Sequence, residues 1–130
     1  MSNEEVTFFD QVGGESTFRR LVEKFYEGVA VDPILRPMYP DEDLTEAKER
    51  LFLFLQQYWG GPTTYSQLRG HPRLRMRHSP FRVGLEERDA WLSHMKEAVA
   101  SLNLVAGLEN ELWTYMVAAA HSLVNVEDQI

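Results

Sequence analysis

Histidine is the residue type best suited to metal binding or proton transfer in this 130-residue chain, because the sequence contains no cysteine. The four histidines are His71, His78, His94 and His121. No two of them stand four residues apart, and neither HExxH nor another zinc-ligand spacing occurs. The pattern therefore disfavours a metal site built from several histidines and leaves open a site with one histidine ligand.

His78 is the best placed of the four, because Leu74 stands one turn before it and Phe81 follows shortly after it. An imidazole between apolar neighbours can bind the iron of a haem. The alternative is a hydrogen-bonded structural histidine, which is the commoner role for a single histidine. His94 and His121 fall on long amphipathic stretches, where we expect structural or exposed roles.

The segment around His78 is basic although the whole chain is acidic. Thirteen basic and twenty acidic side chains give a net charge of −7. Five of the basic side chains fall within residues 69–82, which hold no carboxylate: Arg69, Arg73, Arg75, Arg77 and Arg82. A haem is a flat apolar disc with two propionates, so arginines at its rim would suit it through charge-assisted hydrogen bonds. A solvated basic face, or a site for another phosphate or carboxylate ligand, would have the same composition.

Three polar aromatic residues are further candidates for a ligand site. Tyr26 and Trp91 fall on apolar helical faces, and Tyr39 lies in the corner Pro37-Met38-Tyr39-Pro40. Buried tyrosine and tryptophan need a partner for the O–H or N–H group. Each could find a backbone carbonyl, but three such donors converging on one cavity would form a site for a polar diatomic ligand.

Helices must position these residues. Apolar residues at the i, i+3, i+4 spacing predict a short first helix and four longer ones, over residues 6–12, 18–30, 44–58, 85–102 and 108–123. Glycine and proline interrupt the stretch 63–83, so at most one short helix fits there, at about 72–79. No period-2 strand pattern occurs, and the predicted fold class is all-α.

Composition bounds the remaining function classes. The chain is 44% hydrophobic and 25% charged, which is typical of one globular domain, and we expect residues 1–6 and 127–130 to form an extension and a tail. The lack of cysteine excludes disulfides, thiol nucleophiles, iron–sulfur clusters and thioether-linked haem. The acidic balance argues against nucleic acid as a partner. No signal peptide or membrane-spanning run is found, so we expect no membrane insertion and a cytoplasmic location.

Several motifs together resemble a known family, the truncated haemoglobins of group II, over about residues 7 to 126. The motifs are Gly13-Gly14, Phe25-Tyr26, Tyr39-Pro40, Gln57-Tyr58-Trp59-Gly60-Gly61-Pro62, the run from His71 to His78, and Glu87-Arg88-Asp89-Ala90-Trp91-Leu92. At position 39 the chain has tyrosine rather than phenylalanine, and in this it resembles the actinobacterial-type branch of that group.

The resemblance implies a two-over-two helical sandwich around one non-covalent haem b per chain. It makes His78 the proximal iron ligand, with its other ring N–H given to a backbone carbonyl or another polar group. Tyr26, Tyr39 and Trp91 would stabilise the distal ligand. Ala47 falls where many globins place a distal histidine, so that histidine is missing.

The remaining cofactor contacts are predicted from the same resemblance and from proximity to His78. Arg77 is the first choice for a propionate contact. The weaker choices for that contact are Arg50, Tyr58 and Tyr65, and the expected apolar walls are Leu51, Phe54 and Phe81.

The implied function is reversible binding of O₂, and of NO, CO or similar ligands, at a pentacoordinate ferrous iron, with tight binding and slow release of oxygen. NO dioxygenase or peroxidase-like activity would need a reductant, which the sequence does not identify, and a homo-oligomer is left open. Two alternatives of other classes remain at this stage. One is a haem-free helical adaptor that docks an acidic partner through the arginine-rich segment, and the other is an anion-binding domain.

Overall fold

The computed structural model describes residues 6–40, 42–78 and 81–125. Within these ranges the chain forms α-helices and one short 3₁₀ helix and no strand, which confirms the all-α class. The elements are α1 (Phe8–Gln11), α2 (Glu15–Ala30), η1 (Arg36–Met38), α3 (Thr45–Tyr58), α4 (Thr64–Arg69), α5 (Leu74–His78), α6 (Leu85–Ala100) and α7 (Ala106–Leu123). None of these helices is long and apolar enough to cross a membrane. The expected tail at 127–130, and all of the expected extension except residue 6, lie outside the described residues.

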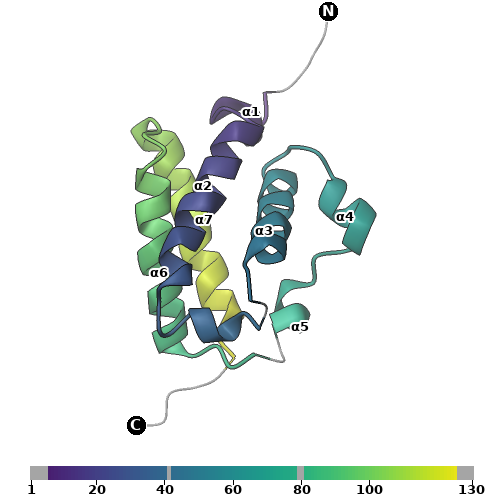
Figure 1. Ribbon diagram of the computed structural model, residues 1–130. Helices are drawn as coiled ribbons and strands as arrows, with labels where there is room; N and C mark the ends of the chain where they lie inside the picture. The colour runs from purple at the N-terminus through teal and green to yellow at the C-terminus, as the bar shows by residue number, and fades with distance from the viewer. Residues whose placement is uncertain (1–5, 41, 79–80, 126–130) are drawn as a thin grey trace, which may run out of the picture.

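The four long helices form two packed pairs. Helix α2 packs against both α3 and α6, and α6 packs against α7, so the α2–α3 pair faces the α6–α7 pair (Figure 1). The predicted apolar faces meet between the pairs, where Phe18, Phe25, Met95 and Leu112 are almost completely buried. This arrangement agrees with the expected two-over-two sandwich.

Helix α3 is buried on more than one side. Phe52 and Leu55 are buried in the core, while Leu51 and Phe54 line a cavity on the side of α4 and α5. The continuous apolar run from 51 to 55 is thereby explained, because a helix that packs on two sides needs apolar residues around more of its circumference.

Asp32, just after the end of α2, sets the direction of the chain through the corner at 35–40. Oδ1 of Asp32 accepts hydrogen bonds from the backbone N–H groups of Ile34 (2.7 Å) and Leu35 (3.2 Å). Oδ2 of the same carboxylate pairs with Nε2 of His94 on α6. The chain turns here into η1, and Tyr39 follows directly after it. Asp32 therefore connects two helices and orients the corner.

The stretch 63–83 differs from the prediction of at most one short helix, because it holds both α4 and α5. Helix α5 falls within the predicted range of about 72–79. Ser79, at the end of that range, lies outside the described residues. Helix α4 was not predicted. The Gln57 side chain holds it from α3: its Oε1 accepts from the Ser66 backbone N–H at 2.9 Å, and its Nε2 donates to the Ser66 hydroxyl at 2.7 Å. Gly70, with φ at 78°, separates the two helices.

Candidate functional site

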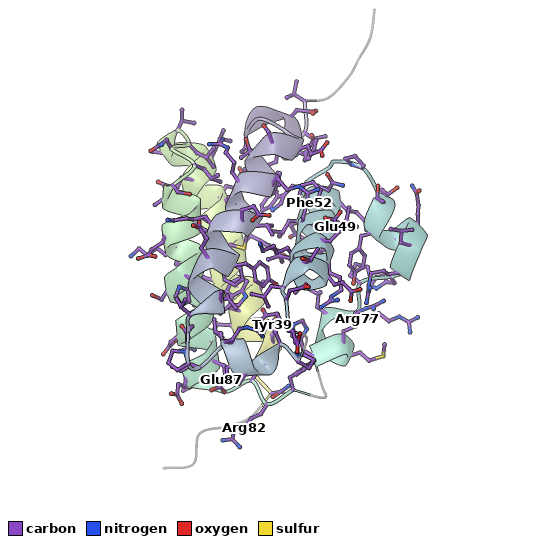
Figure 2. All side chains as sticks on the ribbon, viewed as in Figure 1. Tyr39, Glu49, Phe52, Arg77, Arg82 and Glu87 are labelled. Atoms are coloured by element: carbon purple, nitrogen blue, oxygen red, sulfur yellow. The ribbon has the colours of Figure 1, made fainter. Side chains whose placement is uncertain are left out.

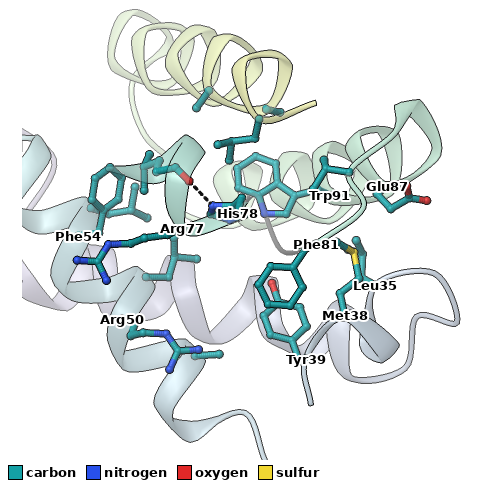
Figure 3. A pocket seen from close by; sticks show the side chains of 18 of the residues that line it. Leu35, Met38, Tyr39, Arg50, Phe54, Arg77, His78, Phe81, Glu87 and Trp91 are labelled. Carbon is teal, nitrogen blue, oxygen red and sulfur yellow. Dashed lines mark hydrogen bonds between the residues drawn. The ribbon is translucent and has the colours of Figure 1, made fainter. Parts of the chain in front are cut away.

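A cavity of about 500 Å³ opens between α3, α5, α6, α7 and the corner at 35–40. Its walls are mostly apolar, and its volume lies in the range of about 300–1,000 Å³ seen for small-molecule and cofactor pockets. Ten of the eleven predicted site residues line it: Tyr26, Tyr39, Arg50, Leu51, Phe54, Tyr65, Arg77, His78, Phe81 and Trp91. Figure 3 shows several of these side chains gathered around the His78 ring.

His78 closes α5 and presents one ring nitrogen for a ligand. Its Nδ1 lies 2.8 Å from the backbone carbonyl oxygen of Leu74, one turn earlier (dashed line in Figure 3). Because a carbonyl oxygen can only accept, Nδ1 carries the proton and the lone pair is on Nε2. This carbonyl is a partner of the predicted kind. Among the described residues, no group of three His, Asp or Glu could hold a metal ion.

Tyr26 and Tyr39 form the polar corner of the cavity. Their rings meet edge to face with centroids 5.6 Å apart. The Tyr26 hydroxyl lies 3.5 Å from the carbonyl oxygen of Ala47, the outer limit for a hydrogen bond. Burial raises the pKa of Tyr26 far above its usual range, and the neighbouring Tyr39 raises that pKa further. Burial raises the pKa of Tyr39 as well. Both phenols therefore stay protonated at neutral pH and can donate.

Trp91 adds a third donor from α6. Its ring packs edge to face on Phe25, with centroids 5.4 Å apart, which orients the indole from the core side. Within the described part of the chain, its Nε1 makes no hydrogen bond to a protein group. Ala47 and Leu51 line the same cavity without a polar side-chain atom, whereas Tyr26, Tyr39 and Trp91 line it with side chains that carry an O–H or N–H donor.

Arginines line the cavity, but only some of them come from the predicted basic segment at 69–82. Arg69 and Arg77 line the cavity, and Arg82 and Arg73 are exposed (Arg77 and Arg82 are labelled in Figure 2). The side chain of Arg75 lies outside what the structure describes. The remaining arginines of the lining are Arg50 from α3 and Arg88 from α6.

Arg77 also holds the backbone of its own loop. Its Nε donates to the carbonyl of Pro72 (2.6 Å), and its Nη2 donates to the carbonyls of Arg69 (2.8 Å) and His71 (3.2 Å). None of these bonds uses Nη1. The guanidinium can therefore fix the α4–α5 connection and still offer donors to an anionic group at the cavity edge.

Tyr58 is the one predicted site residue that the structure does not bring into the cavity lining. It is 53% exposed, and its ring packs on Tyr115 of α7 with centroids 4.2 Å apart. Tyr58 stands at the last turn of α3, where the chain is leaving the cavity. Its contact with the cofactor stays a prediction, for a residue that lies outside the cavity lining.

Sequence reasoning missed the wall that α7 supplies. Tyr115, Met116 and Ala119 line the cavity. They belong to the apolar face predicted for residues 108–123, so the signal was present, but nothing in the spacing showed that this face reaches His78. Leu35 and Met38 of the corner were missed for the same reason.

The residues present fit a haem. A flat apolar group with two carboxylates needs apolar walls, an imidazole lone pair on one face and cations at one edge. The cavity offers these in Leu51, Phe54, the Nε2 atom of His78, and the side chains of Arg50 and Arg77.

Comparison with known proteins agrees with this site. Residues 7–125 match the family model of the bacterial-like globins. The group 2 truncated hemoglobin YjbI of Bacillus subtilis is 43% identical over 112 residues, which cover 86% of this chain and 84% of that protein.

Solved structures resemble this chain over almost its whole length. A thermostable hemoglobin from the actinobacterium Thermobifida fusca has a TM-score of 0.91 at 67% identity, covering 92% of this chain and 98% of that one. A truncated oxygen-avid haemoglobin from Bacillus subtilis has a TM-score of 0.86 at 40% identity, covering 92% and 99%. With the helical sandwich and the single histidine facing the cavity, these matches show that the chain belongs to the bacterial-like globins, as a group II truncated haemoglobin.

Proposed function

We propose that the protein binds one haem b without a covalent link and uses it to bind O₂, and other diatomic gases, reversibly. The observation that carries the proposal is His78, whose Nδ1 is engaged by the Leu74 carbonyl so that Nε2 is free to ligate iron. The haem, when bound, would supply an iron that can take a gas ligand. All other contributions come from the side chains of this chain.

Holding the cofactor is the task of one face of the cavity. The hydrogen bond from Nδ1 to the Leu74 carbonyl fixes the tautomer and orientation of the His78 ring and raises the basicity of Nε2. Leu51 and Phe54 exclude water from the ring system, and Arg77 offers Nη1 to a propionate. Because the chain has no cysteine, no thioether link can contribute to retention of the haem.

Retaining the gas is the task of the distal donors. The hydroxyls of Tyr26 and Tyr39 and the indole N–H of Trp91 all belong to the cavity lining. Each hydrogen bond to a polarised ligand contributes roughly 1.5 kcal/mol, about tenfold in affinity or residence time. Two or three such donors favour tight binding and slow release. The similar protein from Bacillus subtilis is described as oxygen-avid, which supports this expectation.

The visible spectrum of the purified protein tests the proposal. We expect a Soret band that is lost, or strongly shifted, in His78→Ala. His121→Ala is the matched control, because His121 is exposed and absent from the cavity lining. Colourless, folded protein that fails to bind haemin saturably would contradict the proposal and would reopen the adaptor and anion-binding alternatives.

Reaction with NO is a separate question. Measuring steady-state NO consumption with O₂ and a reductase present distinguishes an NO dioxygenase from a protein that only binds gases.

A further inference from the structure

Two of the three distal donors stand on elements that one side-chain pair joins. Tyr39 follows η1 in the corner, and Trp91 lies on α6 (both are labelled in Figure 3). At the start of the corner, the Asp32 carboxylate accepts a hydrogen bond from Nε2 of His94, which stands one turn after Trp91 on α6. This bond therefore connects the corner that carries Tyr39 to the helix that carries Trp91.

The pair is largely withdrawn from water. The side chain of His94 is 21% exposed and that of Asp32 is 12% exposed. Ion pairs on the open surface contribute little, because water and salt screen the charges, whereas a shielded hydrogen bond to a carboxylate is stronger. The imidazole also lies directly against α2 at Gly28, where a Cβ atom would overlap the ring. His94 is thus held between the carboxylate and the backbone of α2.

Asp32 passes this anchor on to the corner through its second oxygen. Oδ1 accepts from the backbone N–H groups of Ile34 (2.7 Å) and Leu35 (3.2 Å). Leu35 is buried and lines the cavity. Further along the corner, the ring of Tyr39 meets that of Tyr26 edge to face, with centroids 5.6 Å apart. A shift of Asp32 would therefore move the corner and the phenol that it carries.

We propose that Asp32 and His94 are positioning residues for the gas ligand. Their hydrogen bond sets the spacing of the two donors, Tyr39 and Trp91, across the cavity, and with it the strength of the hydrogen bonds that these donors give to O₂. Neither Asp32 nor His94 lines the cavity, so both act through the donors. The proposal rests on the proposed function, because the donors need a gas ligand held at the haem.

The effect of the pair should depend on the polarity of the gas. Hydrogen bonds weaken steeply when the distance or the angle departs from its optimum. Bound O₂ is more polar than bound CO, and it gains more from each donor. Loosening the pair should therefore accelerate the release of O₂ more than that of CO. A general loosening of the fold would accelerate the release of both gases, so the ratio of the two rates separates positioning from a merely structural role.

The test replaces His94 in the haem-loaded full chain. His94→Leu removes the bond to Asp32 and keeps a side chain of similar volume. We expect it to release O₂ about twofold to tenfold faster, the range that one net hydrogen bond spans, with little change for CO. The C–O stretching frequency of the CO-bound protein should rise, because donors aimed less directly at the oxygen weaken the C–O bond less. Stopped-flow and infrared spectroscopy measure the two effects.

A conservative variant and a matched control accompany it. His94→Gln should behave like wild type, because the amide nitrogen of glutamine can take the place of Nε2 and donate to Asp32. Val99→Ala is the control for lost stability on α6, since Val99 is buried and lies outside the cavity lining. It should lower the urea midpoint and leave the ratio of O₂ to CO release unchanged.

Asp32→Asn reaches the pair from the other partner. Its amide oxygen can still accept from the corner, but the bond to His94 is no longer charge-assisted. We expect a smaller acceleration of O₂ release than in His94→Leu, again with little change for CO. This variant keeps the proposal testable if His94→Leu fails to fold, and O₂ release at the wild-type rate in it would then contradict the proposal.

A variant without the two donors shows whether the pair acts through them. In a chain that carries Tyr39→Phe and Trp91→Phe together, adding His94→Leu should not accelerate O₂ release further. A residue that acts by positioning these donors has no effect once they are gone, which a double-mutant cycle detects as strong non-additivity.

The outcomes separate this proposal from the proposed function. Wild-type O₂ release in His94→Leu with an unshifted C–O frequency overturns the positioning role. So does equal acceleration of O₂ and CO, His94→Gln that behaves like His94→Leu, or a further acceleration in the chain without the two donors. All of these results leave gas binding by the loaded protein intact. Wild-type protein that cannot be loaded with haem overturns the proposed function, and the positioning role with it.

Discussion

Trp91 is the donor whose surroundings best separate a functional role from a structural one. Its ring is held by Phe25, while its Nε1 has no protein partner in the described part of the chain. Tyr26, by contrast, has the Ala47 carbonyl within 3.5 Å and Tyr39 beside it. An indole N–H that borders a cavity without a partner is available to a ligand.

We therefore expect Trp91→Phe to accelerate oxygen release about tenfold, because one hydrogen bond of roughly 1.5 kcal/mol is lost. Stopped-flow measurement of release checks this. Trp113→Phe is the control for a Trp-to-Phe change away from the cavity, and release at the wild-type rate in Trp91→Phe would remove Trp91 from the ligand site.

Tyr58 shows how far a motif can predict a single residue. Its place in Gln57-Tyr58-Trp59-Gly60-Gly61-Pro62 contributed to identifying the family, yet its side chain is exposed and lies outside the cavity lining. The motif locates the end of α3, but the direction of one side chain at a helix end depends on what packs beside it. Here that neighbour is Tyr115, 57 positions later in the chain.

The contact between α2 and α6 depends on a glycine. A Cβ atom at Gly28 would overlap the imidazole of His94, which pairs with Asp32 and so orients the corner that carries Tyr39. Gly107, near the start of α7, is different, because a Cβ atom there would meet no neighbour within 4 Å.

Gly28→Ala should therefore destabilise the protein by about 1–3 kcal/mol, the usual cost of overpacking a tight contact. Gly107→Ala should instead stabilise it by about 0.4–1 kcal/mol, because alanine restricts the unfolded chain. Urea unfolding of both variants measures the difference. Equal effects of the two substitutions would show that the close approach of α2 and α6 at Gly28 is unimportant.

Asp32 makes the same contact sensitive to acid. The hydrogen bond from His94 lowers the pKa of the Asp32 carboxyl below its ordinary value of 3.8, and the backbone N–H groups of Ile34 and Leu35 act in the same direction. Since the folded pKa is depressed, this stabilisation is fully present above pH 3.8 and is lost as the pH falls through the folded value.

Asp32→Asn should accordingly be less stable than wild type at neutral pH, and the difference should shrink in acid. Urea midpoints measured from neutral pH to below pH 3.8 test this. Two curves that stay parallel over the whole range would mean that Asp32 titrates alike in the folded and unfolded chains.

Removing the cofactor should affect the whole molecule. The cavity of about 500 Å³ lies against α3, α6 and α7, so without haem these helices lose packing partners along one side. A ligand that binds only the folded state at a hundred times its dissociation constant stabilises it by about 2.7 kcal/mol.

We expect the apoprotein to unfold at a lower temperature than the haemin-reconstituted protein, and the gap to disappear in His78→Ala. Thermal unfolding followed by circular dichroism measures it. A melting temperature that does not respond to haemin in wild type would count against binding in this cavity.

Short-range patterns were sufficient for the long helices and for singling out His78, Tyr26, Tyr39 and Trp91 as candidates. The i, i+3, i+4 spacing is a property of one segment, and an imidazole or phenol keeps its chemistry wherever it stands. Those features can be read along the chain without knowing its neighbours in space. The family motifs add the expectation that the residues converge.

Tertiary packing decided the features that the sequence did not predict. Helix α4 is held by Gln57 across to Ser66, and the α7 wall brings Tyr115 to the cavity. Each of these depends on the direction and distance between groups on different turns or different helices. Such geometry is determined only when the apolar faces pack together, because the same spacing is compatible with many relative placements of the helices.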